Sequence, residues 1–173
     1  MIWHYAQGMA LLSQSKTAEA KKHLAEMKAI MTDTTLKALT IWGINSVFDL
    51  CLIASKTLEG EINAKEKKYA AAISFLQEAT KMEDALNYNE PPDWFFSVRH
   101  HLGAVLIDAE KIQEAQKVYE KDLKNYPKNG WALKGLMNVY EKLGSTQKYN
   151  ETKKQFDEAW KYADIKISSS RIW

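Results

Sequence analysis

The sequence predicts an all-α fold, an α-solenoid of about four helical hairpins with one inserted helix and an extended C-terminal tail. The first observation is that 173 residues include only three prolines and seven glycines, the two residue types that most often interrupt helices. The second is a recurring glycine that is followed by an alanine 12 residues later. The three pairs are Gly8 and Ala20, Gly60 and Ala72, and Gly103 and Ala115. Because a mid-helix glycine costs about 1 kcal/mol relative to alanine, its recurrence indicates close helix–helix approach within hairpins.

The third observation is a repeat spacing of 34 residues. The segment 94–131 contains two apolar patterns of helical period that are separated by a short polar break. Phe96 and Gly130 keep a spacing of 34 residues, and so do Leu102 and Leu136. Self-similarity at a fixed period of this size is typical of stacked helical hairpins.

The repeat phase divides the chain, which we expect to be one domain over residues 1-173, into four units. They cover about residues 2-32, 53-86, 93-128 and 129-162. The stretch 33-52 loses the phase and is interpreted as an insertion, a short extra helix followed by a connector. The tail, 163-173, has no helical period, and we expect it to run back extended along the solenoid.

Two junctions depart from the repeat. Pro91 and Pro92 cannot lie inside a helix, so they separate the second unit from the third. The aromatic residues 94–96 follow directly and are expected to form a small core at that junction. The last helix, about 147–162, carries its apolar residues late in the pattern and is expected to be shifted, as terminal repeats often are.

Charge and composition weigh against nucleic acid and membranes as partners. The net charge is +2 with both signs interspersed, so no strong field favours an anionic surface. Only two of the 24 basic residues, Arg99 and Arg171, are arginines, the side chain best suited to phosphate and base contacts. The most apolar stretch, 41–54, is short and contains Asn45 and Asp49, which argues against membrane insertion.

The sequence contains no recognisable catalytic, cofactor or metal site. His100 and His101 are adjacent, so on a helix they point about 100° apart and cannot easily hold one ion. No His-Glu-x-x-His pattern and no Gly-x-Ser-x-Gly elbow occurs. Cys51 is the single cysteine and is interpreted as a small buried hydrophobe. We therefore expect no enzyme activity, no metal and no cofactor.

One hairpin carries residues at a diagnostic spacing. They are Leu102, Gly103, Leu106, Ala115, Tyr119 and Pro127, and this set is similar to the 34-residue tetratricopeptide repeat, or TPR. The chain resembles a TPR protein over nearly its whole length. The stretches 88–103, 129–133 and 159–165 also resemble the C-terminal parts of large, mostly uncharacterised bacterial TPR proteins. The resemblance implies a right-handed α-solenoid and a protein-interaction role, and it implies no reaction.

In TPR proteins the first helices of the hairpins line a groove that holds a peptide or protein segment. Transferred by repeat phase, the resemblance implies these protein-binding residues: Tyr5, Met9, Glu61, His100, Asp108, Trp131, Lys134 and Asn138. Lys134 and Asn138 also match one part of the carboxylate clamp that some TPR domains use for chaperone C-termini. The other units lack the remaining clamp residues, so a solvated helix face is the favoured interpretation of this pair.

We expect a non-catalytic protein–protein interaction or scaffold module that binds a peptide or protein segment in its groove. One alternative is an accessory domain of a larger enzyme. Another is a self-assembling module, a homo-oligomer formed through the exposed N-terminal hairpin. Because Met1 leads directly into a helical pattern, we expect the chain to be the C-terminal piece of a longer bacterial protein. The cytoplasm is the favoured compartment, with an upstream signal peptide as the alternative.

Overall fold

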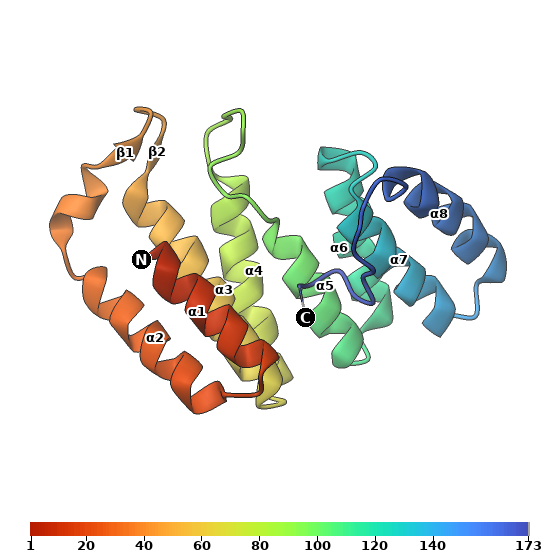
Figure 1. Cartoon of the computed structure of the whole chain (residues 1–173), viewed down its shortest axis with the longest axis horizontal. Helices are drawn as coiled ribbons and strands as arrows, with labels where there is room; N and C mark the ends of the chain where they lie inside the picture. The colour runs from red at the N-terminus through yellow and green to blue at the C-terminus, as the bar shows by residue number, and fades with distance from the viewer. Residues whose placement is uncertain (173) are drawn as a thin grey trace. The chain divides into compact units, whose positions relative to one another are not determined.

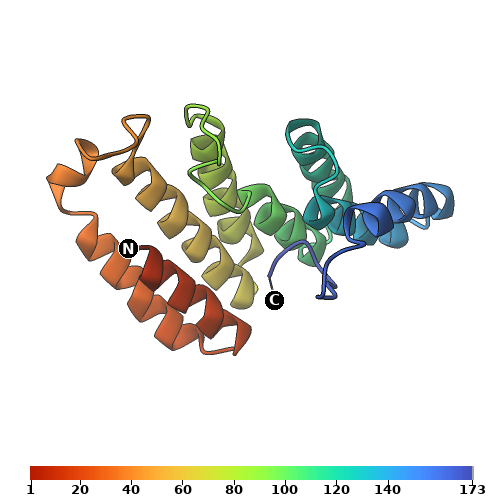
Figure 2. The same cartoon turned by 45° about the horizontal axis from the view of Figure 1, so that its top comes forward.

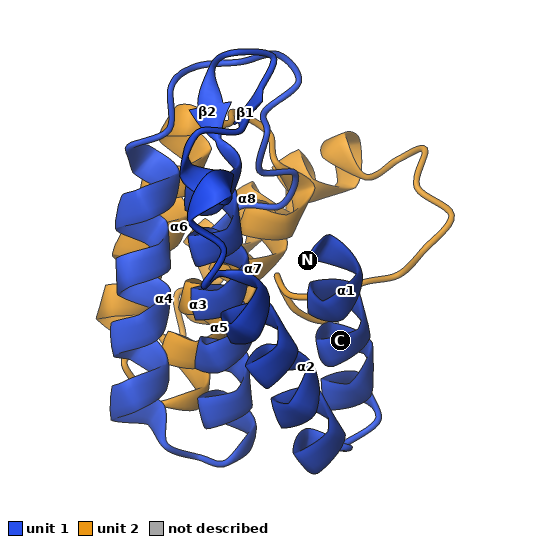
Figure 3. Ribbon diagram, turned by 90° about the vertical axis from the view of Figure 1, so that its left-hand side faces the viewer, with its two compact units in different colours: residues 1–98 blue, residues 99–173 orange. Residues whose placement is uncertain are grey.

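The computed structural model describes residues 1–172. Over this range the chain forms eight α-helices, one 3-10 helix and two short strands. It divides into two compact units, unit 1 (Met1–Val98) and unit 2, which begins at Arg99 (Figure 3). Each unit is built from helical hairpins. Every helix in residues 1–172 is too short or too polar to cross a lipid bilayer.

Unit 1 consists of two antiparallel hairpins (Figure 1). Helices α1 (Ile2–Ser13) and α2 (Thr17–Ile30) form the first, and α3 (Val47–Lys65) and α4 (Tyr69–Asp84) form the second. Both α1 and α2 pack against α3. The fully buried side chains of this core include Leu12, Met27, Ile53, Leu58 and Leu76.

Two of the recurring glycines lie at contacts between these helices. A Cβ atom at Gly8 would come within 2.6 Å of the Leu58 side chain, and one at Gly60 would come equally close to Leu76. The missing side chains therefore let leucines of the neighbouring helices fill the space. The Gly60 contact joins α3 to α4 and is the close approach within a hairpin that the glycine–alanine spacing predicts, whereas the Gly8 contact joins α1 to α3 of the next hairpin.

The insertion after α2 contains a 3-10 turn and a small β-hairpin. The 3-10 helix η1 covers Thr34–Lys37 and is capped by the Asp33 carboxylate, which accepts a hydrogen bond from the Thr35 backbone N–H at 2.9 Å. Strands β1 (Thr40–Ile41) and β2 (Asn45–Ser46) pair antiparallel. The short extra helix expected in this stretch is a single 3-10 turn. The connector after it is the β-hairpin, in which the chain reverses direction at residues 42 and 43, which both have positive φ.

Helix α3 begins at Val47, inside the stretch 33–52 that the sequence assigned to the insertion. Its N-cap is Ser46, whose hydroxyl accepts a hydrogen bond from the Phe48 N–H at 3.1 Å. The negative charge of Asp49 in the first turn also favours a helix start there. The capping serine, rather than the repeat phase, therefore sets this boundary.

A buried asparagine links the β-hairpin to the loop that follows α4. Asn45 is 3 % exposed, and its Nδ2 donates to the Asn87 carbonyl at 2.9 Å and to Asp93 Oδ2 at 2.7 Å. Its Oδ1 accepts from the Asn87 N–H at 2.8 Å. These three bonds hold two segments that lie more than 40 residues apart in the sequence.

The aromatic residues after the double proline pack partly as expected. Trp94 is buried, and its ring meets the Tyr5 ring edge-to-face with centroids 5.5 Å apart. Phe95 is 68 % exposed, so it adds little to that core. Burial of Tyr5, with Glu61 and Glu83 nearby, raises the pKa of its phenol.

Unit 2 contains α5 (Val98–Asp108), α6 (Ile112–Asn125), α7 (Gly130–Lys142) and α8 (Thr146–Ala159). Helix α7 packs against both α6 and α8. The non-helical tail follows α8 and turns back over the helices of this unit (Figure 1 and Figure 2). The tail contains bends rather than a strand, so it is less regular than the extended path that was expected.

The core of unit 2 is organised around Tyr119 on α6, which is fully buried. A Cβ atom at Gly103 on α5 would lie 2.3 Å from its ring, and one at Gly135 on α7 would lie 2.2 Å from it. The ring therefore occupies the space that side chains at both glycines would need. Tyr119 fixes the approach of α5 and α7 to α6.

Candidate protein-binding site

The candidate site is the surface of unit 2 on which the C-terminal tail lies, and it is called the tail-binding face below. It is formed by His100 and Asp108 of α5, Tyr119 of α6 and Asn138 of α7, all of which contact the tail. Three helices thus present polar groups to one segment. The tail provides a view of how this face holds a polypeptide.

The tail is first held through its backbone. Trp160 at the end of α8 donates its indole N–H to the Ile165 carbonyl at 2.9 Å. Asn138 donates its carboxamide N–H to the Ser168 carbonyl at 2.9 Å. Backbone carbonyls are present at every position of a polypeptide, so these two contacts fix the path of the segment without selecting its sequence.

Ser170 is the deepest point of the tail and is fully buried. Its hydroxyl donates to the His100 backbone carbonyl at 2.7 Å. The Tyr119 hydroxyl oxygen lies 2.6 Å from the Ser170 hydroxyl oxygen. Because the single proton of Ser170 goes to a carbonyl that can only accept, Tyr119 must be the donor to Ser170.

Tyr119 is suited to remain a donor. Burial raises the pKa of its phenol above the ordinary value of 10.0, so the O–H stays protonated over the physiological range. Its position is fixed by Gly103 and Gly135 on either side of the ring. The donor is therefore preorganised before the tail binds.

An ion pair lies next to the serine contact. The Arg171 guanidinium donates to the Asp108 carboxylate, with 15 % and 39 % of the two side chains exposed. Asp108 is the last residue of α5, and the negative end of a helix dipole also attracts a cation. The Arg171 side chain is therefore more buried than the basic side chain of a typical surface ion pair.

His100 contributes to the face through its backbone, while its imidazole points to another partner. Its Nε2 lies 3.2 Å from Asp122 Oδ2, and both side chains are almost completely buried. Asp122 comes from α6. The histidine–aspartate contact ties α5 to α6 directly beneath the carbonyl that receives Ser170.

The residues implied by the repeat phase have different locations. In unit 2, Asp108, His100 and Asn138 come together on the tail-binding face. Trp131 and Lys134 are half-buried on α7. The Trp131 ring packs edge-to-face on Trp160 with centroids 5.4 Å apart.

In unit 1 the implied residues Tyr5, Met9 and Glu61 are all buried, with at most 4 % of each exposed. They contribute to packing, and a partner could touch them only after the surrounding side chains moved. His100 in unit 2 is likewise only 2 % exposed. Repeat phase gives the side of its own helix on which a residue lies, but burial by neighbouring segments cannot be read from phase.

Sequence reasoning missed Tyr119, Ser170 and Arg171 as members of a site. Tyr119 matched a repeat position and was therefore interpreted only as core. Arg171 carried a usable signal, since it is one of only two arginines in a chain rich in lysine. Ser170 carried no usable sequence signal, because it is one of three consecutive serines at 168–170.

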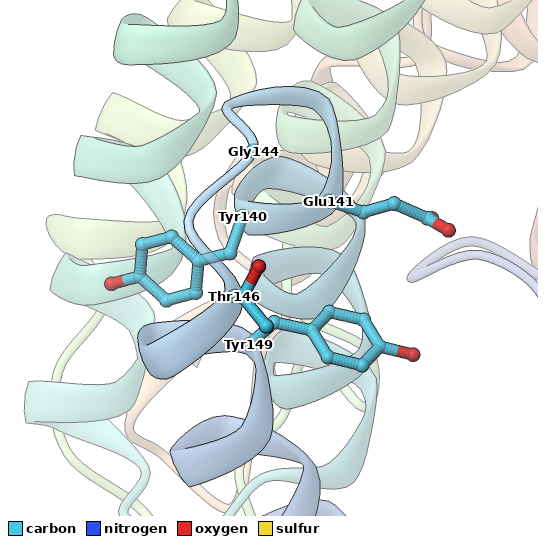
Figure 4. A pocket seen from close by; sticks show the side chains of 5 residues that line it. All are labelled: Tyr140, Glu141, Gly144, Thr146 and Tyr149. Atoms are coloured by element: carbon cyan, nitrogen blue, oxygen red, sulfur yellow. The ribbon is translucent and has the colours of Figure 1, made fainter.

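The described surface also contains a depression that has fewer features of a binding site. An open depression of about 300 Å³ lies at the α7–α8 turn and is lined by Tyr140, Glu141, Gly144, Thr146 and Tyr149. The Tyr140 ring points to one side of the turn, while the Tyr149 ring and the Glu141 side chain extend to the other side (Figure 4). Residues 1–172 contain no cluster of three or more histidine, cysteine or acidic side chains placed to hold a metal ion.

No protein-family model matches the sequence, and no curated protein matches it. Among solved structures, the chain is similar to "MamA AMB-1 P212121", with a TM-score of 0.52 and 15% identity, over 95% of this chain and 93% of that chain. A second structure, "MamA AMB-1 C2221", gives a TM-score of 0.49 at 15% identity, over 91% of this chain and 97% of that chain. MamA is a TPR-like helical solenoid. The likeness to the first structure confirms the predicted fold class: the chain has an all-α, TPR-like solenoid fold.

Proposed function

We propose that this chain is a non-catalytic interaction or scaffold module, and that the tail-binding face of unit 2 binds a segment of a partner protein. One observation carries the proposal. The chain's own tail lies on this face through two backbone contacts, a buried serine and an ion pair. A surface that holds one irregular segment in this way has the contacts needed to hold another.

The tail is bound in a manner that favours exchange. Its apolar residues Ile165 and Ile172 are 52 % and 54 % exposed, so little apolar burial holds it. Each neutral hydrogen bond contributes only about 0.5–1.5 kcal/mol net. The tether to α8 raises the local concentration of the tail, and a partner segment must compete with it.

The test uses the full chain with a weakened tail. A variant with Ser170→Val and Arg171→Glu loses the buried hydroxyl and reverses the charge, which should free the face. A fluorescein-labelled peptide with the sequence of residues 164–173 is then titrated, and fluorescence anisotropy is recorded. We expect saturable binding to the variant and weaker apparent binding to the unmodified chain, whose own tail competes.

The binding location is checked with Asn138→Ala and Asp108→Ala in the same weakened-tail chain. Both substitutions should lower the peptide affinity while the helical circular dichroism remains unchanged. Lys142→Ala, at the far end of α7, is the matched control. If neither the Asn138 nor the Asp108 substitution changes the peptide affinity, the peptide does not bind at the tail-binding face.

A second candidate function is supported by the N-terminal hairpin. Ile2 and Trp3 on α1 are 49 % and 61 % exposed, which makes an apolar surface that a second copy could cover. Ile2→Asp with Trp3→Asp should abolish any concentration-dependent increase in mass during sedimentation. A chain that stays monomeric at all concentrations would exclude this self-assembly.

A further inference from the structure

We propose that the tail-binding face recognises a serine followed directly by arginine in an extended segment of a partner protein, and that Ser170–Arg171 is the chain's resident copy of this dipeptide. The inference rests on the proposed function, because it names the kind of segment that the same face selects. The occupant is a protein segment with this dipeptide, since each subsite matches the chemistry of one of its side chains.

The first subsite accepts a small side chain that both donates and accepts a hydrogen bond. Ser170 is fully buried between the His100 carbonyl, which accepts its proton in addition to the helical hydrogen bond of α5, and the Tyr119 hydroxyl, which needs an acceptor. An alanine would leave the Tyr119 hydroxyl buried without its acceptor, and a site built for a hydroxyl discriminates strongly against an analogue that lacks it. Larger polar side chains would not fit a position that leaves a serine no exposed surface.

The subsite is rigid because the core builds it. Tyr119 lies between Gly103 and Gly135, and a Cβ atom at either glycine would clash with its ring. The carbonyl on the other side belongs to α5, whose His100 is held by Asp122 at 3.2 Å. Donor and acceptor are therefore fixed relative to each other, which is the condition for selectivity.

The second subsite reads the adjacent residue. Asp108 at the C-terminal end of α5 binds the Arg171 guanidinium. Both the carboxylate and the helix end favour a cation. A guanidinium offers several donors in a fixed plane, so arginine fits better than lysine. A glutamate at this place would meet Asp108 with like charge.

The third contact sets the register. Asn138 donates to the Ser168 carbonyl, two residues before the buried serine. This contact would accept any residue, while it fixes how far the segment advances over α7. The recognised element is thus a backbone carbonyl, one intervening residue, serine and arginine.

The experiment uses the full chain with Ser170→Val and Arg171→Glu as host, and labelled peptides of residues 164–173 as probes. We expect the unmodified peptide to bind about tenfold or more tightly than its Ser170→Ala form, because both serine hydrogen bonds are lost and the buried Tyr119 hydroxyl is left without an acceptor. The Arg171→Lys peptide should bind several-fold more weakly. A Ser168→Ala peptide is the control, since only the backbone of Ser168 is used, and it should bind like the unmodified one.

Charge exchange tests the arginine subsite. An Arg171→Glu peptide should fail to bind a host that carries Ser170→Val and Arg171→Ala, and it should recover binding when that host also carries Asp108→Arg. Recovery cannot come from a general loss of folding, so it separates recognition from stability. Absence of recovery would overturn the assignment of Asp108.

The outcomes separate this inference from the proposed function. If all peptides bind equally and Asn138→Ala still weakens them, the face binds segments but does not select serine–arginine, and only the inference fails. If no peptide binds, the proposed function fails as well. If the unmodified chain forms dimers that Ser170→Ala abolishes, the occupant is the tail of a second copy, and the assignment to another protein is wrong.

Discussion

Tyr119 donates a hydrogen bond to Ser170, with 2.6 Å between two hydroxyl oxygens that lie 51 residues apart in the sequence. Both side chains are fully buried. The same contact joins the core of unit 2 to its C-terminal tail, since Ser170 passes its own proton to the His100 carbonyl. Core packing and occupation of the tail-binding face are therefore physically coupled.

Replacing Ser170 by alanine in the full chain should release the tail. The buried Tyr119 hydroxyl loses its acceptor, at a cost of about 1–3 kcal/mol, so the open form should become roughly 5- to 150-fold more populated. Trypsin cleavage after Lys166 reports this opening. Ser168→Ala is the matched control and should leave the cleavage rate unchanged. Equal rates for the two variants would show that the serine contact does not hold the tail.

Substituting Gly103 by alanine should destabilise unit 2. The new Cβ atom would lie 2.3 Å from the Tyr119 ring, and overpacking of this kind costs about 1–3 kcal/mol. Urea unfolding followed by circular dichroism measures the loss. Combining Gly103→Ala with Tyr119→Leu should cost less than the sum of the two single changes, because the smaller side chain removes the clash. Strict additivity would contradict the packing described above.

Asn45→Ala should loosen the loop that follows α4. The change removes three hydrogen bonds to Asn87 and Asp93 and leaves buried groups without partners, which costs about 2–3 kcal/mol. Hydrogen exchange of residues 86–93 should increase. Thr40→Ala in the same β-hairpin removes only an exposed side chain and should change stability by less than about 0.5 kcal/mol.

Alkaline titration should separate Tyr119 from ordinary tyrosines. Burial raises the pKa of its phenol in the folded chain above 10.0, and the unfolded chain has an ordinary pKa of about 10. The folded form thus holds this proton more tightly. The stabilising contribution of Tyr119 to the free energy of unfolding is therefore complete below pH 10, and it falls as the pH rises above 10. In Tyr119→Phe the tyrosinate absorbance at pH 10–11 should be unchanged, because the lost residue was still protonated. A decrease in that absorbance would show that Tyr119 ionises normally.

Sequence patterns predicted the helical hairpins because the relevant contacts repeat locally. Gly103 and Ala115, for example, lie on consecutive helices of one hairpin, and their spacing reflects the geometry of that hairpin. The β-hairpin at 40–46 was not predicted, since its turn depends on positive φ at Trp42 and Gly43, and tryptophan rarely adopts this conformation. The Ser46 cap was overlooked because the repeat phase was extended from residue 53.

The binding role of the residues implied by repeat phase stays a prediction, but the structure shows where they lie. Asp108 and Asn138 were found by phase, and both contact the tail. Tyr5 and Glu61 occupy equivalent phases but lie inside unit 1. Helical period gives the direction of a side chain relative to its own axis, and it contains no information about the segment that covers it.

The sequence by itself determined that this protein is all-α and built from TPR-like hairpins, because helix period, turn residues and small-residue spacing act over a few turns of chain. The tertiary structure alone decided where the tail lies and which residues it covers. The contacts responsible, from Ser170 to Tyr119 and to His100, span 51 and 70 residues. Such bonds depend on the packing of the helices, since the Tyr119 ring lies between Gly103 and Gly135.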